Sequence, residues 1–144
     1  MKMVDIGNKD ITEREAVVEG IVSLSPKAIL AINKKSIPKG DVLETARLAG
    51  ILAAKKTPFL IPLCHPIAIE YAEINFSIGK NKIKITSTVR ANAKTGVEME
   101  ALTATAVSAL TIYDMCKPLD KNIVISDIKL IKKTGGKSGI YIRK

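Results

Sequence analysis

The chain has 144 residues, 47% of them hydrophobic, which is enough for one domain over residues 1–144 with a buried core and leaves no room for a second. Charges interrupt every apolar run before the roughly 18 residues that cross a bilayer, and residues 1–19 lack the apolar region of a signal peptide, so we expect a cytoplasmic protein that does not enter a membrane. The net charge of +9 favours phosphate-rich partners, among them small molecules, anionic membrane surfaces and nucleic acids.

The first predicted strand covers residues 15–24, where small or apolar residues alternate with a period of two. Ser25 can then cap a helix, and Pro26 is tolerated at the first helical position. The sequence therefore predicts a short helix that runs through residues 29–32.

A longer helix is predicted after Asp41, which can act as its N-cap with Glu44 three residues further on, and it extends to Lys56. Prolines then recur over residues 58–66, where neither a helix nor a paired strand can propagate. We expect an ordered loop there.

A hairpin is predicted next. The apolar residues of 67–78 change phase near Ala72 and Glu73, so we expect this strand to bend or bulge at that point. Residues 79–82 form the turn, and residues 83–89 return as the second arm.

The longest helix is predicted from Thr95, which fits a capping box with Glu98, to about Lys117. Pro118 ends it and biases Lys117 away from helical geometry.

A last strand covers residues 123–131 and changes phase at Ser126 and Asp127, ahead of a tail over residues 132–144. The order is strand, short helix, helix, hairpin, helix, strand. It predicts an α+β fold in which an antiparallel sheet has its helices packed on one face.

Asp114 and Lys117 lie three residues apart and therefore on one face of the longest helix. Such a pair is usually a surface salt bridge. If the pair is partly buried, a lysine beside a carboxylate can transfer protons. Because this face continues through Thr103, Val107 and Leu110, which are mostly apolar, we expect partial burial.

His65 is the only histidine, and prolines frame its loop segment from Leu63 to Pro66. A lone loop histidine is more often structural than catalytic. The rigid frame favours a functional role, and the main chain here could present amide and carbonyl groups to a heterocyclic base.

Glu98 and Glu100 follow the start of the longest helix. Glu98 is explained by the capping box and Glu100 by the helix dipole. Both carboxylates could equally accept hydrogen bonds from the amino and ring N–H groups of a guanine or a pterin.

The glycine-rich tail contains Gly136, Lys137 and Ser138, which imitate the end of a P-loop. The first glycine of that motif would fall at Ile131, so a nucleotide site of this type is excluded. The segment is either a phosphate cradle or a solvated basic tail.

With Cys64, Cys116 and His65 as the only cysteines and histidine, one subunit cannot assemble a closed zinc site, and we expect free thiols. No metal ligand is assigned.

Segments along nearly the whole chain, taken together and in this order, resemble the MoaC family of molybdenum-cofactor biosynthesis enzymes. Each segment is short, and it is their number and order that carry the resemblance. They are residues 3–6, 14–16, 39–42, 46–51, 53–57, 60–66, 94–103, 109–117, 124–126 and 135–139.

The resemblance implies a ferredoxin-like subunit that forms dimers and then a hexamer, with active sites at the dimer interface. It implies a lyase that converts 3′,8-cyclo-7,8-dihydroguanosine 5′-triphosphate, a cyclic dihydro-GTP derivative, into cyclic pyranopterin monophosphate with release of pyrophosphate. No cofactor is required by this chemistry, although Mg²⁺ could accompany the substrate phosphates.

By the same resemblance, Asp114 and Lys117 match catalytic residues. Residues that match or adjoin substrate-binding segments are Leu63, Cys64, His65, Glu98, Met99 and Glu100, and basic residues that would hold the triphosphate are Arg14, Lys39, Lys133 and Lys137.

Two other classes of function fit the sequence less well. The charge of +9 and the lysine-rich hairpin over residues 80–84 would suit a nucleic-acid-binding module, but aromatic residues are only 3% of the chain, too few for a stacking platform. A purely structural oligomer would leave the framed Cys64–His65 loop unexplained. We therefore expect a small-molecule substrate and no nucleic-acid or membrane partner.

Overall fold

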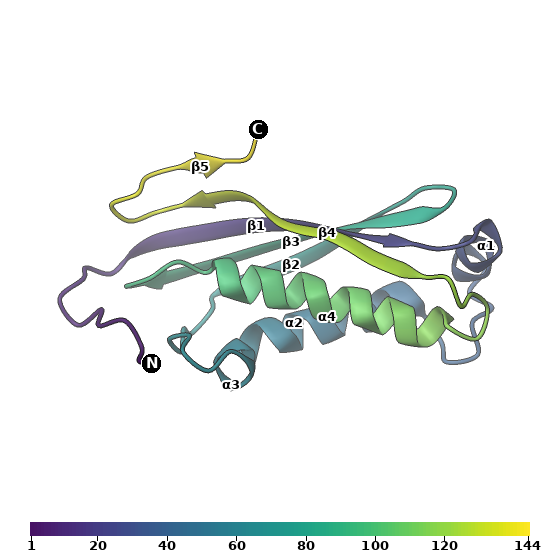
Figure 1. Cartoon of the computed structure of the whole chain (residues 1–144), viewed down its shortest axis with the longest axis horizontal. Coiled ribbons are helices and arrows are strands. Elements are labelled where there is room, and N and C mark those ends of the chain that lie inside the picture. Colours follow the sequence, from purple (N-terminus) through teal and green to yellow (C-terminus); the bar gives the residue numbers. More distant parts are fainter.

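The computed structural model describes residues 1–144 as one antiparallel sheet with the strand order β2-β3-β1-β4-β5 and with α2 and α4 on one face (Figure 1). This confirms the expected α+β, ferredoxin-like architecture. The elements are β1 (Thr12–Ser23), α1 (Pro26–Asn33), α2 (Val42–Lys55), α3 (Thr57–Leu60), β2 (Tyr71–Ile78), β3 (Lys82–Ala93), α4 (Glu98–Cys116), β4 (Val124–Thr134) and β5 (Tyr141–Ile142).

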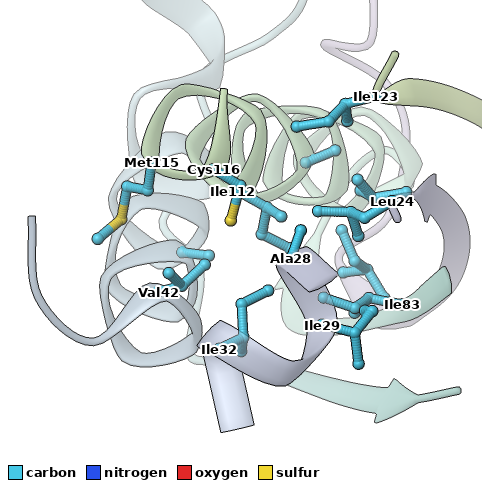
Figure 2. Packing of buried hydrophobic residues seen from close by; sticks show 14 of the residues in the cluster. Leu24, Ala28, Ile29, Ile32, Val42, Ile83, Ile112, Met115, Cys116 and Ile123 are labelled. Carbon is cyan, nitrogen blue, oxygen red and sulfur yellow. The ribbon is translucent and has the colours of Figure 1, made fainter. Parts of the chain in front are cut away.

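The main core lies between the sheet and the helices. Ile83 and Ile85 of β3 and Ile112 of α4 are fully buried in it, and burying each such side chain stabilises the fold by about 1.5–3 kcal/mol. Figure 2 shows Ala28 and Ile32 of α1 closing one end of this core against α4. None of the helices is long and apolar enough to span a membrane.

Helices α2 and α4 approach closely because Gly50 has no side chain. A Cβ at this position would lie 2.9 Å from the carbonyl oxygen of Ala104, closer than real Cβ atoms come to backbone. The hydroxyl of Ser108 donates a hydrogen bond to the carbonyl of Ala46 at 2.9 Å across the same contact. This packing fixes the position of α4, which carries the candidate residues Glu98, Met99, Glu100 and Asp114.

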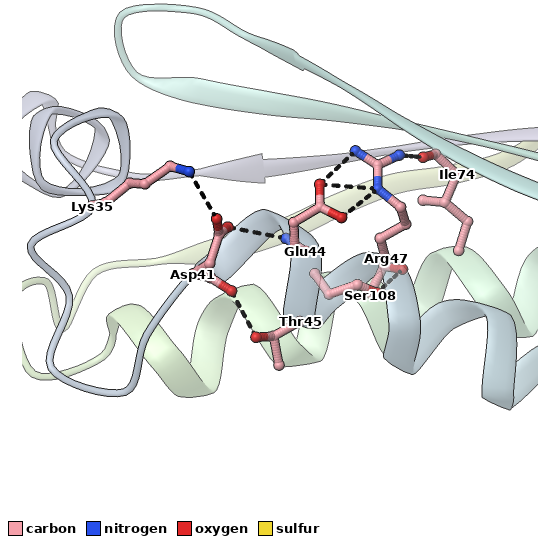
Figure 3. A network of polar contacts seen from close by, with 8 residues as sticks. Lys35, Asp41, Glu44, Thr45, Arg47, Ile74 and Ser108 are labelled. Carbon is pink, nitrogen blue, oxygen red and sulfur yellow. Dashed lines mark hydrogen bonds and ion pairs between the residues drawn. The ribbon is translucent and has the colours of Figure 1, made fainter.

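The predicted helix starts are confirmed at α1 and α2. The hydroxyl of Ser25 accepts from the amide of Ala28 at 3.2 Å, and a carboxylate oxygen of Asp41 accepts from the amide of Glu44 at 3.1 Å. Figure 3 shows the surrounding network, in which Arg47 bridges α2 to the edge strand β2.

The bend predicted near Ala72 and Glu73 is wrong. Strand β2 begins at Tyr71 and pairs with β3 residue for residue, without a bulge. The change of phase instead marks the boundary between the loop over residues 67–70 and the strand. A loop followed by a straight strand gives the same sequence pattern as a single strand with a bend.

The phase change predicted in the last strand is confirmed. The pairing of β1 with β4 shifts between Glu19 and Ile21, and Asp127 has a φ of 53°, as expected of a β-bulge. Strand β4 continues past the predicted end to Thr134, and the short pairing of β5 with β4 was not predicted.

Candidate active site

The candidate residues form two groups at the two ends of α4. The start of the helix lies beside the loop over residues 62–66, through a contact between Cys64 and Glu100, and its end lies beside Lys39 in the connection between α1 and α2 (Figure 1). With a rise of 1.5 Å per residue, Asp114 lies about 24 Å along the helix from Glu98. One chain therefore does not bring the two groups together.

The Asp114 cluster consists of Lys39, Asp114 and Lys117. The Nζ of Lys39 lies 2.6 Å from one carboxylate oxygen of Asp114, and the Nζ of Lys117 lies 2.9 Å from the other. From the sequence, Lys39 was grouped with the basic residues for the triphosphate. The structure places it beside Asp114 instead.

The two ammonium groups, Lys39 first and then Lys117, hold the pKa of Asp114 to about 2. Asp114 in turn raises the pKa of Lys117. In the single chain Lys117 is therefore held as an ammonium ion, which can donate a proton but cannot accept one.

The expected burial of this pair is wrong. The side chains of Asp114 and Lys117 are 53% and 55% exposed, and Leu110, on the same face, is 58% exposed. Leu110 points to solvent and not to the core, whereas Thr103, earlier on the same face, is buried. Lys117 also retains helical geometry, with φ −55° and ψ −28°, so the distortion expected from Pro118 does not occur.

The Glu98 cluster lies at the start of α4 and contains Cys64, Glu98, Glu100 and Lys133. The predicted capping box is wrong, because Val97 is at the N-cap and no side chain caps the helix. Instead, one carboxylate oxygen of Glu98 accepts from the Nζ of Lys133 of β4 at 3.3 Å. This contact links residues that are distant in sequence.

Two carboxylate oxygens of this cluster are buried without a partner. They are one oxygen each of Glu98 and Glu100, and Glu100 as a whole is only 1% exposed. The other oxygen of Glu100 lies 3.9 Å from the Sγ of Cys64. Buried acceptors without donors are rare in folded proteins, and they match the N–H groups of a bound heterocycle.

Burial raises the pKa of Glu100, and the neighbouring charge of Glu98 adds to the rise. Burial also raises the pKa of the Cys64 thiol, with the Glu100 carboxylate contributing in the same direction. Cys64 is therefore a neutral thiol that can donate a weak hydrogen bond to Glu100. It is not an activated nucleophile.

The framed loop points its histidine at the N-terminal segment. The Nε2 of His65 lies 2.7 Å from the carbonyl oxygen of Val4. Leu63 is exposed and Met99 is half-buried. His65 and Lys94 also line a cavity of about 270 Å³.

A second cavity, of about 280 Å³, is called here the basic pocket. Arg14 is only 6% exposed, and its Nε donates to the carbonyl of Ala93 at 3.4 Å. At Gly136, where φ is +72°, a Cβ would lie 2.8 Å from the Cζ of Arg14, so only glycine lets the tail pack here. The residues that line the pocket are Asn8, Lys9, Asp10, Thr12, Arg14, Gly136 and Lys137.

Arg14, Gly136 and Lys137 of this pocket could be identified from the sequence, whereas four others were missed. These four precede or begin β1 and belong to no motif, so only their nearness to Arg14 in the chain could have pointed to them. They are Asn8, Lys9, Asp10 and Thr12.

The Glu98 cluster and the basic pocket lie at the same end of the molecule, because Lys133 pairs with Ala16 in the sheet, two residues from Arg14. The Glu98 cluster thus offers unpaired hydrogen-bond acceptors, and the basic pocket offers unpaired cations. No three His, Cys, Asp or Glu side chains of the chain come together as a group that could hold a metal ion.

Comparisons with known proteins agree with the resemblance seen in the sequence. The model of the MoaC family matches residues 3–136. A cyclic pyranopterin monophosphate synthase of Heliobacterium modesticaldum is 53% identical over 99% of this chain and 91% of its own length. Proteins with the same name from Thermoanaerobacter sp. and Clostridium perfringens are 52% and 55% identical, over 99% and 96% of this chain and 92% and 89% of their own lengths. Because the match extends over almost the whole chain in each case, the chain belongs to the MoaC family.

Proposed function

We propose that the protein is a cyclic pyranopterin monophosphate synthase of molybdenum-cofactor biosynthesis. The observation that carries the proposal is the near full-length similarity to enzymes of this name. In the proposed reaction, 3′,8-cyclo-7,8-dihydroguanosine 5′-triphosphate rearranges to the pterin, and a substrate hydroxyl replaces pyrophosphate on the α-phosphorus. The unpaired acceptors and the basic pocket fit the two ends of such a substrate.

The Glu98 cluster would bind the heterocycle. A guanine or pterin carries amino and ring N–H donors on one edge, and the unpartnered oxygens of Glu98 and Glu100 supply matching acceptors. The main chain of residues 63–65 and Met99 would complete this part of the site. Bound donors would also satisfy carboxylate oxygens that the free chain buries without partners.

The basic pocket would hold the triphosphate. Arg14 and Lys137 line it, and both lack a carboxylate partner within the chain. Guanidinium and ammonium groups stabilise the negative charge that accumulates on departing pyrophosphate. Mg²⁺ on the phosphates is compatible with this arrangement, and the proposed reaction needs no redox cofactor.

The Asp114 cluster would carry the proton transfers that ring opening and ring closure require. Lys117 is the proton donor, and Asp114 orients it. For Lys117 to accept a proton in return, its pKa must fall, which requires burial or the loss of the Asp114 contact. A second copy packed over this surface would provide the burial.

We further propose that the complete site forms between two copies of the chain. An apolar stripe follows the outer side of α4 between the two clusters. An exposed apolar helix face of this kind is typical of a surface that packs against another protein chain. The stripe consists of Met99, Leu102, Ala106, Leu110 and Tyr113, none of which is buried.

A two-fold axis across the middle of α4 would cover this stripe with its own copy. It would also bring the start of one α4 to the end of the other, so that the Glu98 cluster of one copy meets the Asp114 cluster of its partner. Dimers of this kind assembling into a hexamer are the expected quaternary structure.

The test is release of pyrophosphate from the cyclic dihydro-GTP substrate by the purified protein. We expect Lys117→Ala and Asp114→Ala each to abolish release without changing the oligomer measured by light scattering. Lys121→Ala, an exposed lysine without an ion pair, is the matched control and should be as active as wild type. Full turnover by the first two variants would refute the catalytic assignment, and an inactive wild-type protein would refute the function.

A further inference from the structure

The thiol of Cys64 lies beside Glu100 at the start of α4. Its Sγ is 3.9 Å from one carboxylate oxygen of Glu100 and 3.7 Å from the carbonyl oxygen of His65. A thiol has one proton to donate, and an ionised carboxylate is a stronger acceptor than a carbonyl. The S–H of Cys64 is therefore directed to Glu100 whenever Glu100 is charged.

The main chain holds Cys64 in this place. Its amide donates to the carbonyl of Ile61 at 3.2 Å, which closes a turn directly after α3. Pro62 and Pro66 restrict the backbone on both sides of the residue. The thiol thus reaches Glu100 from a fixed position in the loop.

Glu100 depends on this donor because it has almost no contact with water. It is only 1% exposed, and no basic side chain lies within ion-pair distance of it. Cys64 supplies the one hydrogen bond that Glu100 accepts from another side chain. The second carboxylate oxygen of Glu100 is buried without a partner.

The neighbouring Glu98 shows the same division between its two oxygens. One accepts from the Nζ of Lys133 at 3.3 Å, and the other is buried without a partner. In both carboxylates one oxygen is held by the chain and one is left without a donor. An unpartnered oxygen on a side chain as buried as Glu100 points to a ligand, and the contact at the first oxygen decides which way the second one faces.

We propose that Cys64 is a positioning residue, whose thiol holds one oxygen of Glu100 so that the other stays free for an N–H donor of the heterocycle. The inference rests on the proposed function for the identity of that donor. It gives the side chain of Cys64 a role through Glu100 and not through direct contact with the substrate.

The same contact helps Glu100 to stay charged inside the protein. Burial raises the pKa of Glu100, and the charge of Glu98 on the same helix raises it further, whereas the hydrogen bond from Cys64 lowers it. Lys133 of β4 acts on this place only through its pair with Glu98. Loss of the thiol should therefore raise the pKa of Glu100 and leave its carboxylate free to turn.

NMR titration of the Glu100 carboxyl in the full chain tests the contact without any substrate. Cys64→Ala should raise this pKa above that of wild type, and Cys64→Ser, which keeps a donor hydroxyl, should restore most of the difference. Cys116→Ala is the matched control, because it removes the other thiol of the chain, at the opposite end of α4, and should leave the pKa of Glu100 unchanged. Equal pKa values in wild type and Cys64→Ala would overturn the contact.

Turnover of the cyclic dihydro-GTP substrate tests the positioning role. Loss of one hydrogen bond that aligns Glu100 should raise KM about three- to tenfold in Cys64→Ala and change kcat less. The acidic limb of the kcat/KM profile should move to higher pH together with the pKa of Glu100. Cys64→Ser should return both towards wild type, and wild-type KM and pH profile in Cys64→Ala would overturn the role.

The two measurements separate this inference from the proposed function. The titration needs no turnover, so an inactive wild-type protein would refute the reaction while the contact between Cys64 and Glu100 is still decided by the pKa. An active wild-type protein whose Cys64→Ala variant is unchanged in both measurements would overturn the positioning role alone.

Discussion

Asp114 lies between two ammonium groups, at 2.6 Å from Lys39 and 2.9 Å from Lys117. One carboxylate with two lysines leaves the cluster with a net positive charge, which suits a proton donor that faces an anionic substrate. Lys39 also competes with Lys117 for the carboxylate. Its removal should leave Lys117 more tightly paired with Asp114.

The titration of Asp114 makes the stability of the fold depend on pH in the acid range. Its pKa of about 2 lies below the ordinary value of 3.8, so its contribution to stability is present above about pH 4 and is lost as the pH falls towards 2. Lys39→Ala should raise this pKa and reduce the loss of stability in that range. NMR titration of the Asp114 carboxyl measures the shift, with Lys121→Ala as the control. A pKa unchanged by Lys39→Ala would contradict the contact.

Glu100 gives the opposite dependence on pH. Burial raises its pKa, so the folded chain holds its proton more tightly than the unfolded chain, and stability falls as the pH rises through that pKa. Glu100→Gln should therefore raise the melting temperature relative to wild type by more at pH 8 than at pH 5, and it should abolish turnover. Thermal unfolding at both pH values is the measurement. Glu73→Gln, exposed on β2, should show no such difference, and a pH-independent effect at Glu100 would contradict the raised pKa.

At the residue scale, the roles of the site residues stay a prediction, and their surroundings could not be predicted from the sequence. The resemblance placed Asp114 and Lys117 at the end of α4. Local patterns then predicted their burial and a capping role for Glu98. Both failed, because Glu98 is drawn to Lys133 by a contact between distant residues, and because the face of α4 that carries Leu110 is turned to solvent.

Among the elements, α2 and α4 are the pair on which the site depends, since their contact sets the direction of α4. Alternation and helix caps predicted β1, α1 and α2 closely, because these signals are local. The start of β2 was mistaken for a bulge, since a loop and a bent strand give the same change of phase. Strand β5 has too few residues to leave a pattern.

The substitution Gly50→Ala tests the close contact between α2 and α4. Alanine favours a helix over glycine by about 1 kcal/mol, but its Cβ would lie 2.9 Å from the carbonyl oxygen of Ala104. Overpacking of this kind costs about 1–3 kcal/mol, so we expect a net loss in the free energy of unfolding measured with urea. Gly79→Ala, where the Cβ would meet only ordinary contacts, should be nearly neutral. A stabilised Gly50→Ala variant would show that the helices are further apart.

For the whole molecule, the decisive feature is the distance between the two clusters. About 24 Å of helix separates Glu98 from Asp114, and no rearrangement of side chains spans it. The proposed two-fold dimer would remove the separation and cover the apolar stripe of α4 at the same time. The resemblance implies active sites between subunits, but the sequence did not group Lys39 with Asp114 or Lys133 with Glu98.

Complementation between two inactive variants tests this composite site most directly. Lys117→Ala disables the Asp114 cluster and Glu100→Gln disables the Glu98 cluster, so each variant alone should release no pyrophosphate. In an equal mixture refolded together, half of the dimers are mixed and each of these has one intact site, which predicts about one quarter of wild-type activity. A mixture as inactive as its components would contradict the shared site.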